Sequence, residues 1–222
     1  MKEFNYYLIP GMGANHRIYA GFRLKYGQVH FLDWVDHRQS KNLTDYAHIM
    51  AERVTTENNI LIGSSMGGMM AVEMSRIVKP DLTVLVSAPT GRHQFPPVLK
   101  TAGASRFHRI VPVAAVPYFY KLADTFMGFK TDAQRAMFYE MLSGLGPRFV
   151  HFSVKSVLEW SNTKDPDGKF IQIVGDQDKL FDHRKMANPM VVQGGGHFSA
   201  FEKGSEISEM INAFVRNEFG EK

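Results

Sequence analysis

The segment from Asn58 to Ser75, NNILIGSSMGGMMAVEMS, has the residue types and spacing that most directly suggest chemistry. Two adjacent serines stand between a short apolar run and a helical pattern. A side chain on a tight strand-to-helix turn crowds the residues two positions before and after it. Ser65 has Gly63 and Gly67 at these positions, whereas Ser64 has the larger isoleucine and methionine. The GxSxG spacing in this setting therefore predicts that Ser65 is a nucleophile.

A serine hydroxyl is a weak nucleophile at neutral pH, so it needs a base oriented by an acid. Of the nine histidines, we select His197, which lies in the stretch MVVQGGGHFSAF directly after a strand-like run. Its glycine neighbours leave room for the imidazole to approach Ser65. His197 is therefore the predicted base.

The predicted acid comes from the stretch FIQIVGDQDKLF, where two aspartates follow another strand-like run. We choose Asp178, because Gly175 lets the chain turn out of the strand and a residue three positions further on can reach back toward His197. Asp176 is the alternative. The chain order serine, aspartate, histidine agrees with the order expected for a nucleophile on a GxSxG turn.

A reaction at a carbonyl also needs two backbone N–H groups to bind the developing negative charge. Met66 is the first residue of the predicted helix, where the helix dipole favours an anion. Met12 lies between Gly11 and Gly13 in the turn IPGMGANH, after the first apolar run. We predict that Met12 and Met66 supply the two N–H groups, although a plain tight turn also explains the two glycines.

Short apolar runs alternate with helical patterns, which is typical of a parallel sheet with helices on both faces. The helical patterns cover residues 43–55, 66–78 and 205–219. All the strands are short and are expected to be buried. The predicted strands are Phe4–Ile9, Val29–Leu32, Ile60–Ile62, Thr83–Val86, Phe170–Val174 and Met190–Val192.

The alternation breaks between Ala88 and Pro166, where aromatic-rich helical patterns replace the strand-like runs. A segment this long predicts a helical cap over about 91–165, inserted after the strand at 83–86. We expect about a third of its large apolar side chains to line a substrate pocket and the others to form the core of the cap. These side chains are Phe107, Tyr118, Phe119, Tyr120, Phe126, Met127, Phe129, Met137, Phe138, Tyr139 and Met141. Trp34 and His16 are expected near the mouth of the cleft, either as packing or as surface residues.

The overall composition predicts one domain, residues 1–222, with 44% hydrophobic residues and no cysteine. The absence of cysteine excludes disulfides and thiolate metal sites. The apolar run at the N-terminus is too short for a signal peptide, and residues 110–120 contain two prolines and are too few to cross a bilayer. We therefore expect a cytoplasmic protein without a membrane span.

Positive charge is concentrated in residues 91–155, which carry nine Lys or Arg and three Asp or Glu. This distribution indicates either a solvated basic face or attraction of an anionic substrate. We expect a small-molecule substrate rather than a nucleic acid, and a monomer or a homodimer.

The Gly11 turn, Ser65, Asp178, His197 and the final helical pattern together resemble the α/β-hydrolase superfamily, in particular its small capped esterase-like members, including the plant methylesterase and hydroxynitrile lyase group. This resemblance implies a mostly parallel central sheet with helices on both faces and a cap. The chain differs from the family in two ways. No antiparallel hairpin precedes the first strand, so about six strands are expected instead of eight, and Pro10 stands where many members have histidine.

The expected function is that of a serine hydrolase that cleaves a carboxylic ester or thioester through an acyl-enzyme intermediate. This chemistry requires no metal or organic cofactor. Two alternatives remain, because one fold hosts many reactions. One is an enzyme similar to the hydroxynitrile lyases, in which the same three residues act as acid and base. The other is a binding protein whose three residues are inert.

Overall fold

A single six-stranded parallel sheet organises the protein, whose computed structural model describes residues 2–115 and 122–220. The strand order is β2-β1-β3-β4-β5-β6, and all five neighbouring pairs are parallel. This confirms the predicted fold class and the predicted number of strands. The strands are β1 (Phe4–Ile9), β2 (Gly27–Phe31), β3 (Asn59–Ser64), β4 (Leu82–Val86), β5 (Phe170–Gly175) and β6 (Met190–Val192).

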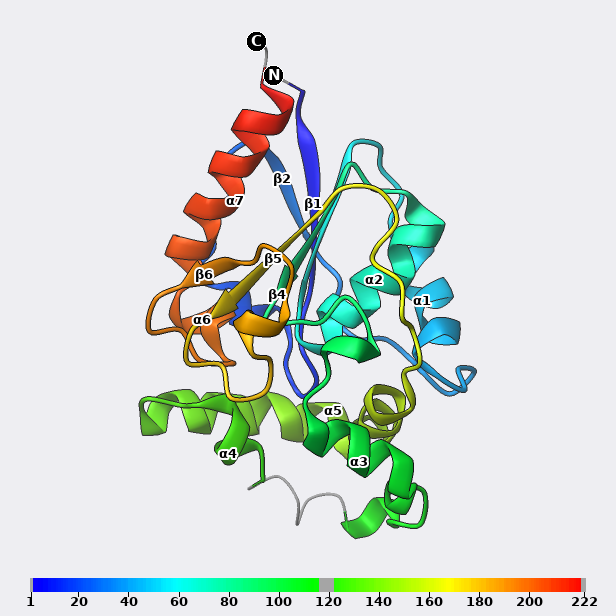
Figure 1. Ribbon diagram of the computed structural model, residues 1–222. Helices are drawn as coiled ribbons and strands as arrows, with labels where there is room; N and C mark the ends of the chain where they lie inside the picture. Colours follow the sequence, from blue (N-terminus) through cyan, green and yellow to red (C-terminus); the bar gives the residue numbers. More distant parts are fainter. Residues whose placement is uncertain (1, 116–121, 221–222) are drawn as a thin grey trace.

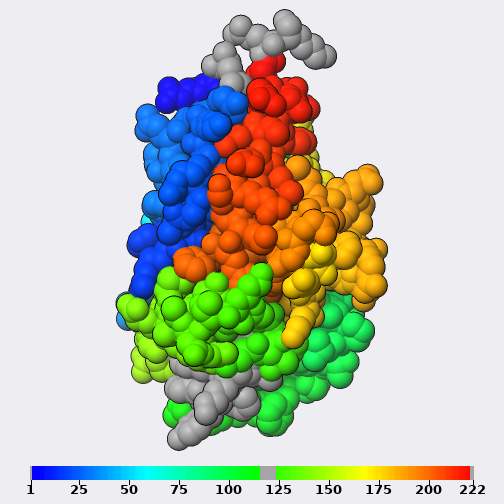
Figure 2. All heavy atoms as spheres, turned by 90° about the vertical axis from the view of Figure 1, so that its left-hand side faces the viewer, coloured from blue at the N-terminus to red at the C-terminus, as the bar shows by residue number. Residues whose placement is uncertain are grey.

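Helices cover both faces of this sheet, because successive side chains of a strand point to opposite faces. α1 (Leu43–Ala51) and α2 (Met66–Val78) lie on one face, and α7 (Gly204–Phe219) lies on the other (Figure 1). In β1, Tyr6 and Leu8 belong to the core on the α7 side, whereas Tyr7 and Ile9 belong to the core on the α1 and α2 side. Figure 2 shows α7 running along the length of its face.

The first helix is shorter than predicted. α1 begins at Leu43, where the Asn42 side chain accepts a hydrogen bond from the backbone N–H of Asp45, and it ends at Ala51 instead of at residue 55. The residues after its end include a run of β-branched side chains at 54–56, which are restricted in a helix and favour extended backbone.

The expectation that every strand is buried is wrong for β2. This strand lies at the edge of the sheet and has only β1 as a neighbour, so Val29 and Phe31 are 40% and 45% exposed. β2 also begins two residues earlier than predicted. At the opposite edge, Met190 and Val191 of β6 are half-buried.

Between β4 and β5, the described residues form helices and no strand. We refer to residues 91–165 as the helical insertion. It lies across the carboxyl ends of the strands, at the end of the molecule opposite to the chain termini (Figure 1). Its elements are η2 (Arg92–Gln94), α3 (Pro97–Ser105), η3 (Phe107–Arg109), α4 (Leu122–Met127) and α5 (Asp132–Glu159).

The large apolar side chains of the helical insertion differ in how far they are buried. Phe138 and Met141 are buried in the core on the α7 side, and others pack partly buried against that core. Phe107 is 60% exposed, so it belongs neither to a core nor to an enclosed pocket. Tyr118, Phe119 and Tyr120 lie outside the described residues.

Within residues 2–115 and 122–220, no helix is long and apolar enough to cross a membrane.

α5 is interrupted in its middle. The helix begins with a capping box between Thr131 and Gln134, and it breaks at Gly146, whose φ of 75° and ψ of 156° are not helical. Pro147 follows, which lacks an N–H group and disfavours helical backbone at the residue before it. The backbone region that Gly146 occupies is essentially restricted to glycine.

Two glycines in α5 provide a matched test of this break. We expect Gly146→Ala to lower the free energy of unfolding by about 1–3 kcal/mol, because a Cβ strains the backbone at this positive φ. Gly144 has ordinary helical backbone, and a Cβ there meets nothing within 4 Å. Gly144→Ala is therefore expected to raise the free energy of unfolding by up to about 1 kcal/mol. Urea denaturation followed by circular dichroism measures both effects, and equal effects of the two substitutions would contradict the explanation.

Candidate active site

The predicted reactive residues lie where the strand order of the sheet reverses. The chain moves from β1 to β2 in one direction and from β3 to β4 in the other. In such sheets the connections leave a crevice outside the carboxyl ends of the two central strands. The Gly11 turn follows β1 and Ser65 follows β3, so both lie at this crevice.

Ser65 has an unusual backbone conformation. Its φ is 53° and its ψ is −118°, which an L-residue adopts only when the surrounding structure imposes it. Its N–H donates to the carbonyl of Val86 at 3.0 Å, and its own carbonyl accepts from Gly68 at 2.9 Å. One bond ties the turn to β4 and the other begins α2, so the side chain is held at the junction of strand and helix.

The glycines on either side of Ser65 are sterically required. A Cβ on Gly63 would lie 2.1 Å from the carbonyl oxygen of Gly67. A Cβ on Gly67 would lie 2.2 Å from the carbonyl oxygen of Ile9, at the end of β1. The GxSxG spacing therefore reflects the close approach of three backbone segments. The sequence argument named the right glycines, but they are crowded by backbone and not by the Ser65 side chain.

His197 connects Ser65 to Asp178. Its Nε2 lies 2.9 Å from Ser65 Oγ, and its Nδ1 lies 3.0 Å from Asp178 Oδ2 and 3.2 Å from Oδ1. The side chains of His197 and Asp178 are almost completely buried, whereas Ser65 is half-buried. The structure thus brings together three side chains that are far apart in the sequence.

A close approach of two glycines also fixes the position of the loop that carries His197. A Cβ on Gly175, at the end of β5, would lie 2.0 Å from the carbonyl oxygen of Gly195. That carbonyl accepts a hydrogen bond from the N–H of Gln177 at 2.9 Å. The turn after β5 and the turn after β6 therefore lie against each other, which puts Asp178 beside His197.

The environment of Asp178 keeps its carboxylate charged. Burial by itself raises the pKa of Asp178, but the charge and hydrogen bond of His197 act in the opposite direction, and so do the N–H groups of Phe181 and Leu180, which donate to Oδ1 at 3.0 and 2.8 Å. The net result is a pKa below the ordinary value of 3.8. A charged carboxylate accepts from Nδ1–H and leaves Nε2 free to accept a proton.

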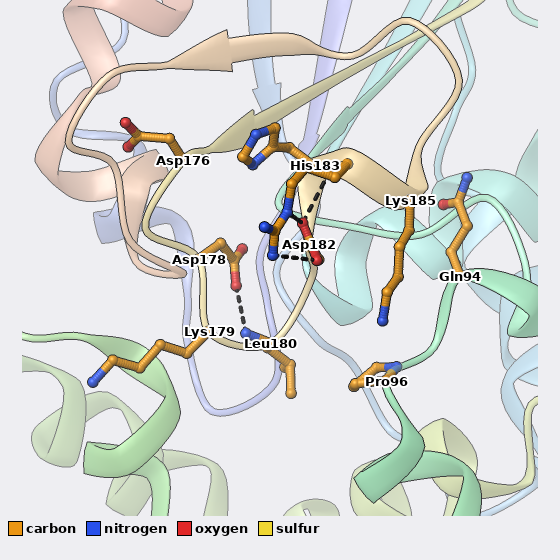
Figure 3. A pocket seen from close by; sticks show the side chains of 10 residues that line it. Gln94, Pro96, Asp176, Asp178, Lys179, Leu180, Asp182, His183 and Lys185 are labelled. Atoms are coloured by element: carbon orange, nitrogen blue, oxygen red, sulfur yellow. Dashed lines mark hydrogen bonds and ion pairs between the residues drawn. The ribbon is translucent and has the colours of Figure 1, made fainter.

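The alternative acid, Asp176, does not contact His197. Its Oδ1 accepts a hydrogen bond from the N–H of Gly194 at 2.7 Å, and its side chain is exposed. Figure 3 shows the carboxylates of Asp176 and Asp178 directed to different sides. The structure thus places Asp178, and not Asp176, against the imidazole.

The Gly11 turn lies directly against Ser65. A Cβ on Gly11 would be 3.4 Å from the Cβ of Ser65. Two donors that the sequence reasoning did not recognise hold this turn: Trp34 Nε1 donates to the carbonyl of Gly11 at 3.2 Å, and the Tyr19 hydroxyl donates to the carbonyl of Ile9 at 2.6 Å. Trp34, expected to be either a packing or a surface residue, thus supports the Gly11 turn. His16 contacts Asp33 instead, with 2.5 Å between Nδ1 and Oδ2.

The N–H groups of Met12 and Met66 have no hydrogen-bond acceptor in the part of the chain that the structure describes. Met66 is the first residue of α2, where intrahelical acceptors are absent by geometry. Met12 follows Gly11, in the turn that lies against Ser65. Both groups are therefore available to a ligand atom.

The helical insertion contacts the loop that carries His197. The N–H of Phe198 donates to the carbonyl of Met127 at 3.2 Å. Lys130 Nζ donates to the carbonyl of Gly194 at 2.8 Å and lies 3.5 Å from a carboxylate oxygen of Glu202. In Figure 2 the insertion packs directly below the segment that contains these residues.

A polar cleft of about 430 Å³ lies beside Asp178, and Ser65 is not among the residues that line it (Figure 3). It is lined by Gln94, Pro96, Asp176, Asp178, Lys179, Leu180, Asp182, His183, Arg184 and Lys185. Arg184 in its wall is paired with Asp182. Among residues 2–115 and 122–220, no group of three or more histidine, aspartate or glutamate side chains is arranged to hold a metal ion.

The sequence of residues 7–209 matches the profile of the alpha/beta hydrolase family. The chain belongs to this family. The match confirms the superfamily to which the sequence motifs pointed. No protein with a curated description matches the sequence.

Members of the alpha/beta hydrolase fold are also found among similar solved structures. A putative lipase from Acinetobacter baumannii AYE has a TM-score of 0.72 at 14% identity, over 97% of this chain and 84% of that one. The N-acyl homoserine lactonase AidH, complexed with N-butanoyl homoserine, has a TM-score of 0.69 at 14% identity, over 100% and 92%. A thermophilic esterase has a TM-score of 0.68 at 17% identity, over 97% and 90%.

The close approach of β3 and α2 can be tested by adding one methyl group. We expect Gly63→Ala to lower the free energy of unfolding by about 3 kcal/mol, because its Cβ meets backbone that cannot move aside. The melting temperature should fall by roughly 6–12 °C. Gly21→Ala is the matched control, since its Cβ meets no atom closer than 3.5 Å, and it should change the melting temperature little. A thermal scan in which Gly63→Ala melts like the parent would contradict the steric argument.

Proposed function

We propose that this alpha/beta hydrolase is a serine hydrolase that cleaves a carboxylic ester or thioester through an acyl-enzyme intermediate. One observation carries the proposal. Ser65 Oγ lies 2.9 Å from His197 Nε2, while Nδ1 of the same imidazole lies 3.0 Å from Asp178. This is the nucleophile, base and acid arrangement of hydrolases that use a serine.

In the first half of the reaction, Ser65 Oγ attacks the carbonyl carbon of the substrate as its proton moves to His197 Nε2. The imidazole becomes positively charged, and the buried carboxylate of Asp178 stabilises that charge through Nδ1–H. His197 then donates the proton to the leaving alcohol or thiol. The product of this half is an ester between Ser65 and the acyl group.

The negative charge that develops on the carbonyl oxygen would be bound by the N–H groups of Met12 and Met66. Their lack of acceptors among the described residues and their places beside Ser65 support this role. The positive end of the α2 dipole favours the same charge. Water, deprotonated by His197, then attacks the acyl-enzyme and releases the acid.

We assign the selection of the substrate to the helical insertion, which would act as a cap over the site. Met127, Phe129 and Met137 are partly buried side chains of the insertion beside the core on the α7 side, and Met127 contacts the loop of His197. Such apolar side chains suit an acyl group. The similar structures include an esterase and a lactonase, and a lactone is a cyclic ester.

The reactivity of Ser65 is tested with a fluorophosphonate, which forms a covalent bond only with an activated serine. Intact-mass measurement is expected to show one adduct on the parent protein and none on Ser65→Ala. A panel of p-nitrophenyl esters of increasing acyl length, a thioester and an N-acyl homoserine lactone then identifies the class of substrate. The parent is expected to turn over at least one of them about 10³-fold or more above Ser65→Ala.

The two alternative functions, a binding protein and a lyase, predict different results in the same experiments. A protein that takes up no fluorophosphonate is a binding protein with three inert residues. A protein that is labelled at Ser65 but turns over no ester, thioester or lactone above Ser65→Ala would point to lyase chemistry with the same residues. Either result would overturn the hydrolase proposal.

The choice of acid is tested by two substitutions two residues apart. We expect Asp178→Asn to lower kcat by about 10⁴-fold, because the amide no longer holds the imidazole in the required tautomer. Asp176→Asn is the matched control, since Asp176 bonds Gly194 instead of His197, and it should change kcat by less than tenfold. Steady-state rates on the best substrate of the panel measure both. A larger loss with Asp176→Asn would assign the role to Asp176.

A further inference from the structure

The outer part of the helical insertion exposes large apolar side chains. Within residues 2–115 and 122–220, six large apolar side chains are exposed, and three of them lie in or next to α3 and η3. Val98 is 52% exposed, Phe107 60% and Ile110 74%. None of the residues of α3 is buried. The rest of the described chain exposes no large apolar side chain to the extent of Ile110.

The geometry of η3 gathers these side chains into rows. In a 3-10 helix, residues three apart lie above one another. The N–H of Ile110 donates to the carbonyl of Phe107, and the N–H of Arg109 donates to the carbonyl of Arg106, and these two bonds form η3. Phe107 and Ile110 therefore form an apolar row, and Arg106 and Arg109 are their respective neighbours in the chain.

Positive charge surrounds the apolar row. The sequence has no Asp or Glu between Asp81 and Asp124. Arg106 is exposed, and its guanidinium makes no hydrogen bond or ion pair with any described residue. Lys100 is exposed, and its Nζ donates only to the carbonyl of His93 at 3.1 Å among the described residues. The cationic groups thus face solvent with most of their donors free.

One acid from a neighbouring element reaches this face. Glu159, at the end of α5, contacts Arg109 at 2.7 Å and His108 at 2.9 Å. Its side chain is 23% exposed, and its Oε1 accepts both contacts. Glu159 therefore balances Arg109 but leaves Arg106 and Lys100 uncompensated.

We propose that a face made of Arg106, Phe107 and Ile110, together with Lys100 of the neighbouring α3, docks on a bilayer of anionic phospholipid. Phe107 and Ile110 enter the boundary between headgroups and acyl chains, and Arg106 and Lys100 contact lipid phosphate groups. The combination of exposed apolar side chains with flanking cations is what a peripheral membrane surface requires. The face lies at the end of the molecule formed by the helical insertion, so docking leaves the sheet and the chain termini in water (Figure 1).

The apolar row is the reason to prefer lipid over other anionic partners. A nucleic acid would use Arg106 and Lys100 but would leave Ile110 and Phe107 in water. A second copy of this chain would bring like charges against one another. A lipid surface takes up both the apolar row and the cations.

The direct test is sedimentation of the full chain with sucrose-loaded vesicles. Vesicles of phosphatidylcholine and phosphatidylglycerol in equal amounts are expected to bind the protein at least tenfold more strongly than pure phosphatidylcholine. Binding should weaken at about 0.5 M NaCl, because salt screens the attraction. Equal binding to both lipids, or no binding at millimolar lipid, would overturn the proposal.

Substitutions then locate the surface. The double substitution Phe107→Ser and Ile110→Ser is expected to weaken binding at least tenfold, and Lys100→Gln and Arg106→Gln about fivefold each. Ile77→Ser is the matched control, because Ile77 is 40% exposed on α2, outside the proposed face. A control that loses as much binding as the double substitution would place the lipid contact elsewhere.

Insertion itself can be observed even where the double substitution does not fold. The chain has no cysteine, so one introduced cysteine takes up a single environment-sensitive dye. A dye on Phe107→Cys should shift its emission to the blue on addition of anionic vesicles, and a dye on Ile77→Cys should not. Identical responses at the two positions would also overturn the proposal. None of these readouts depends on whether Ser65 is reactive.

Discussion

At the carboxyl ends of β1, β3 and β5, neighbouring backbone segments lie so close that a glycine is required where they meet. A Cβ on Gly63, Gly67 or Gly175 would lie between 2.0 and 2.2 Å from a carbonyl oxygen of the facing segment. This contact distance determines where α2 begins and where the loop of His197 lies. The positions of Ser65 and His197 therefore follow from backbone packing before any side chain makes a hydrogen bond.

The strained conformation of Ser65 depends on the same packing. A residue with a φ of 53° and a ψ of −118° is costly in isolation. Here β3, β4 and α2 surround it, and its N–H and carbonyl are both bonded. The stability of the buried sheet thus compensates for local strain, and the strain presents the hydroxyl to the imidazole.

The sequence predicted the sheet, the family and the three residues that meet, because their signals are local. Gly63 and Gly67 mark one turn, Gly175 another, and short apolar runs mark the strands. Long-range support was not predictable. Tyr19 and Trp34 hold the Gly11 turn through their side-chain donors, and no spacing in the sequence connects them to it. The exposure of β2 was missed for a similar reason, since an apolar run does not reveal that its strand lies at an edge.

The helical insertion leaves the sheet after β4 and returns before β5, and it contributes none of Ser65, Asp178 and His197. The glycines that place Ser65 and His197 are therefore separate from the segment that covers these residues. For protein engineering, this means that combinatorial libraries can vary the exposed positions of residues 91–165, while Lys130, Phe138 and Met141 are kept because they support the loop of His197 and the core. The exposed surface of residues 91–165 and the three side chains that meet at Ser65 thus belong to different parts of one polypeptide.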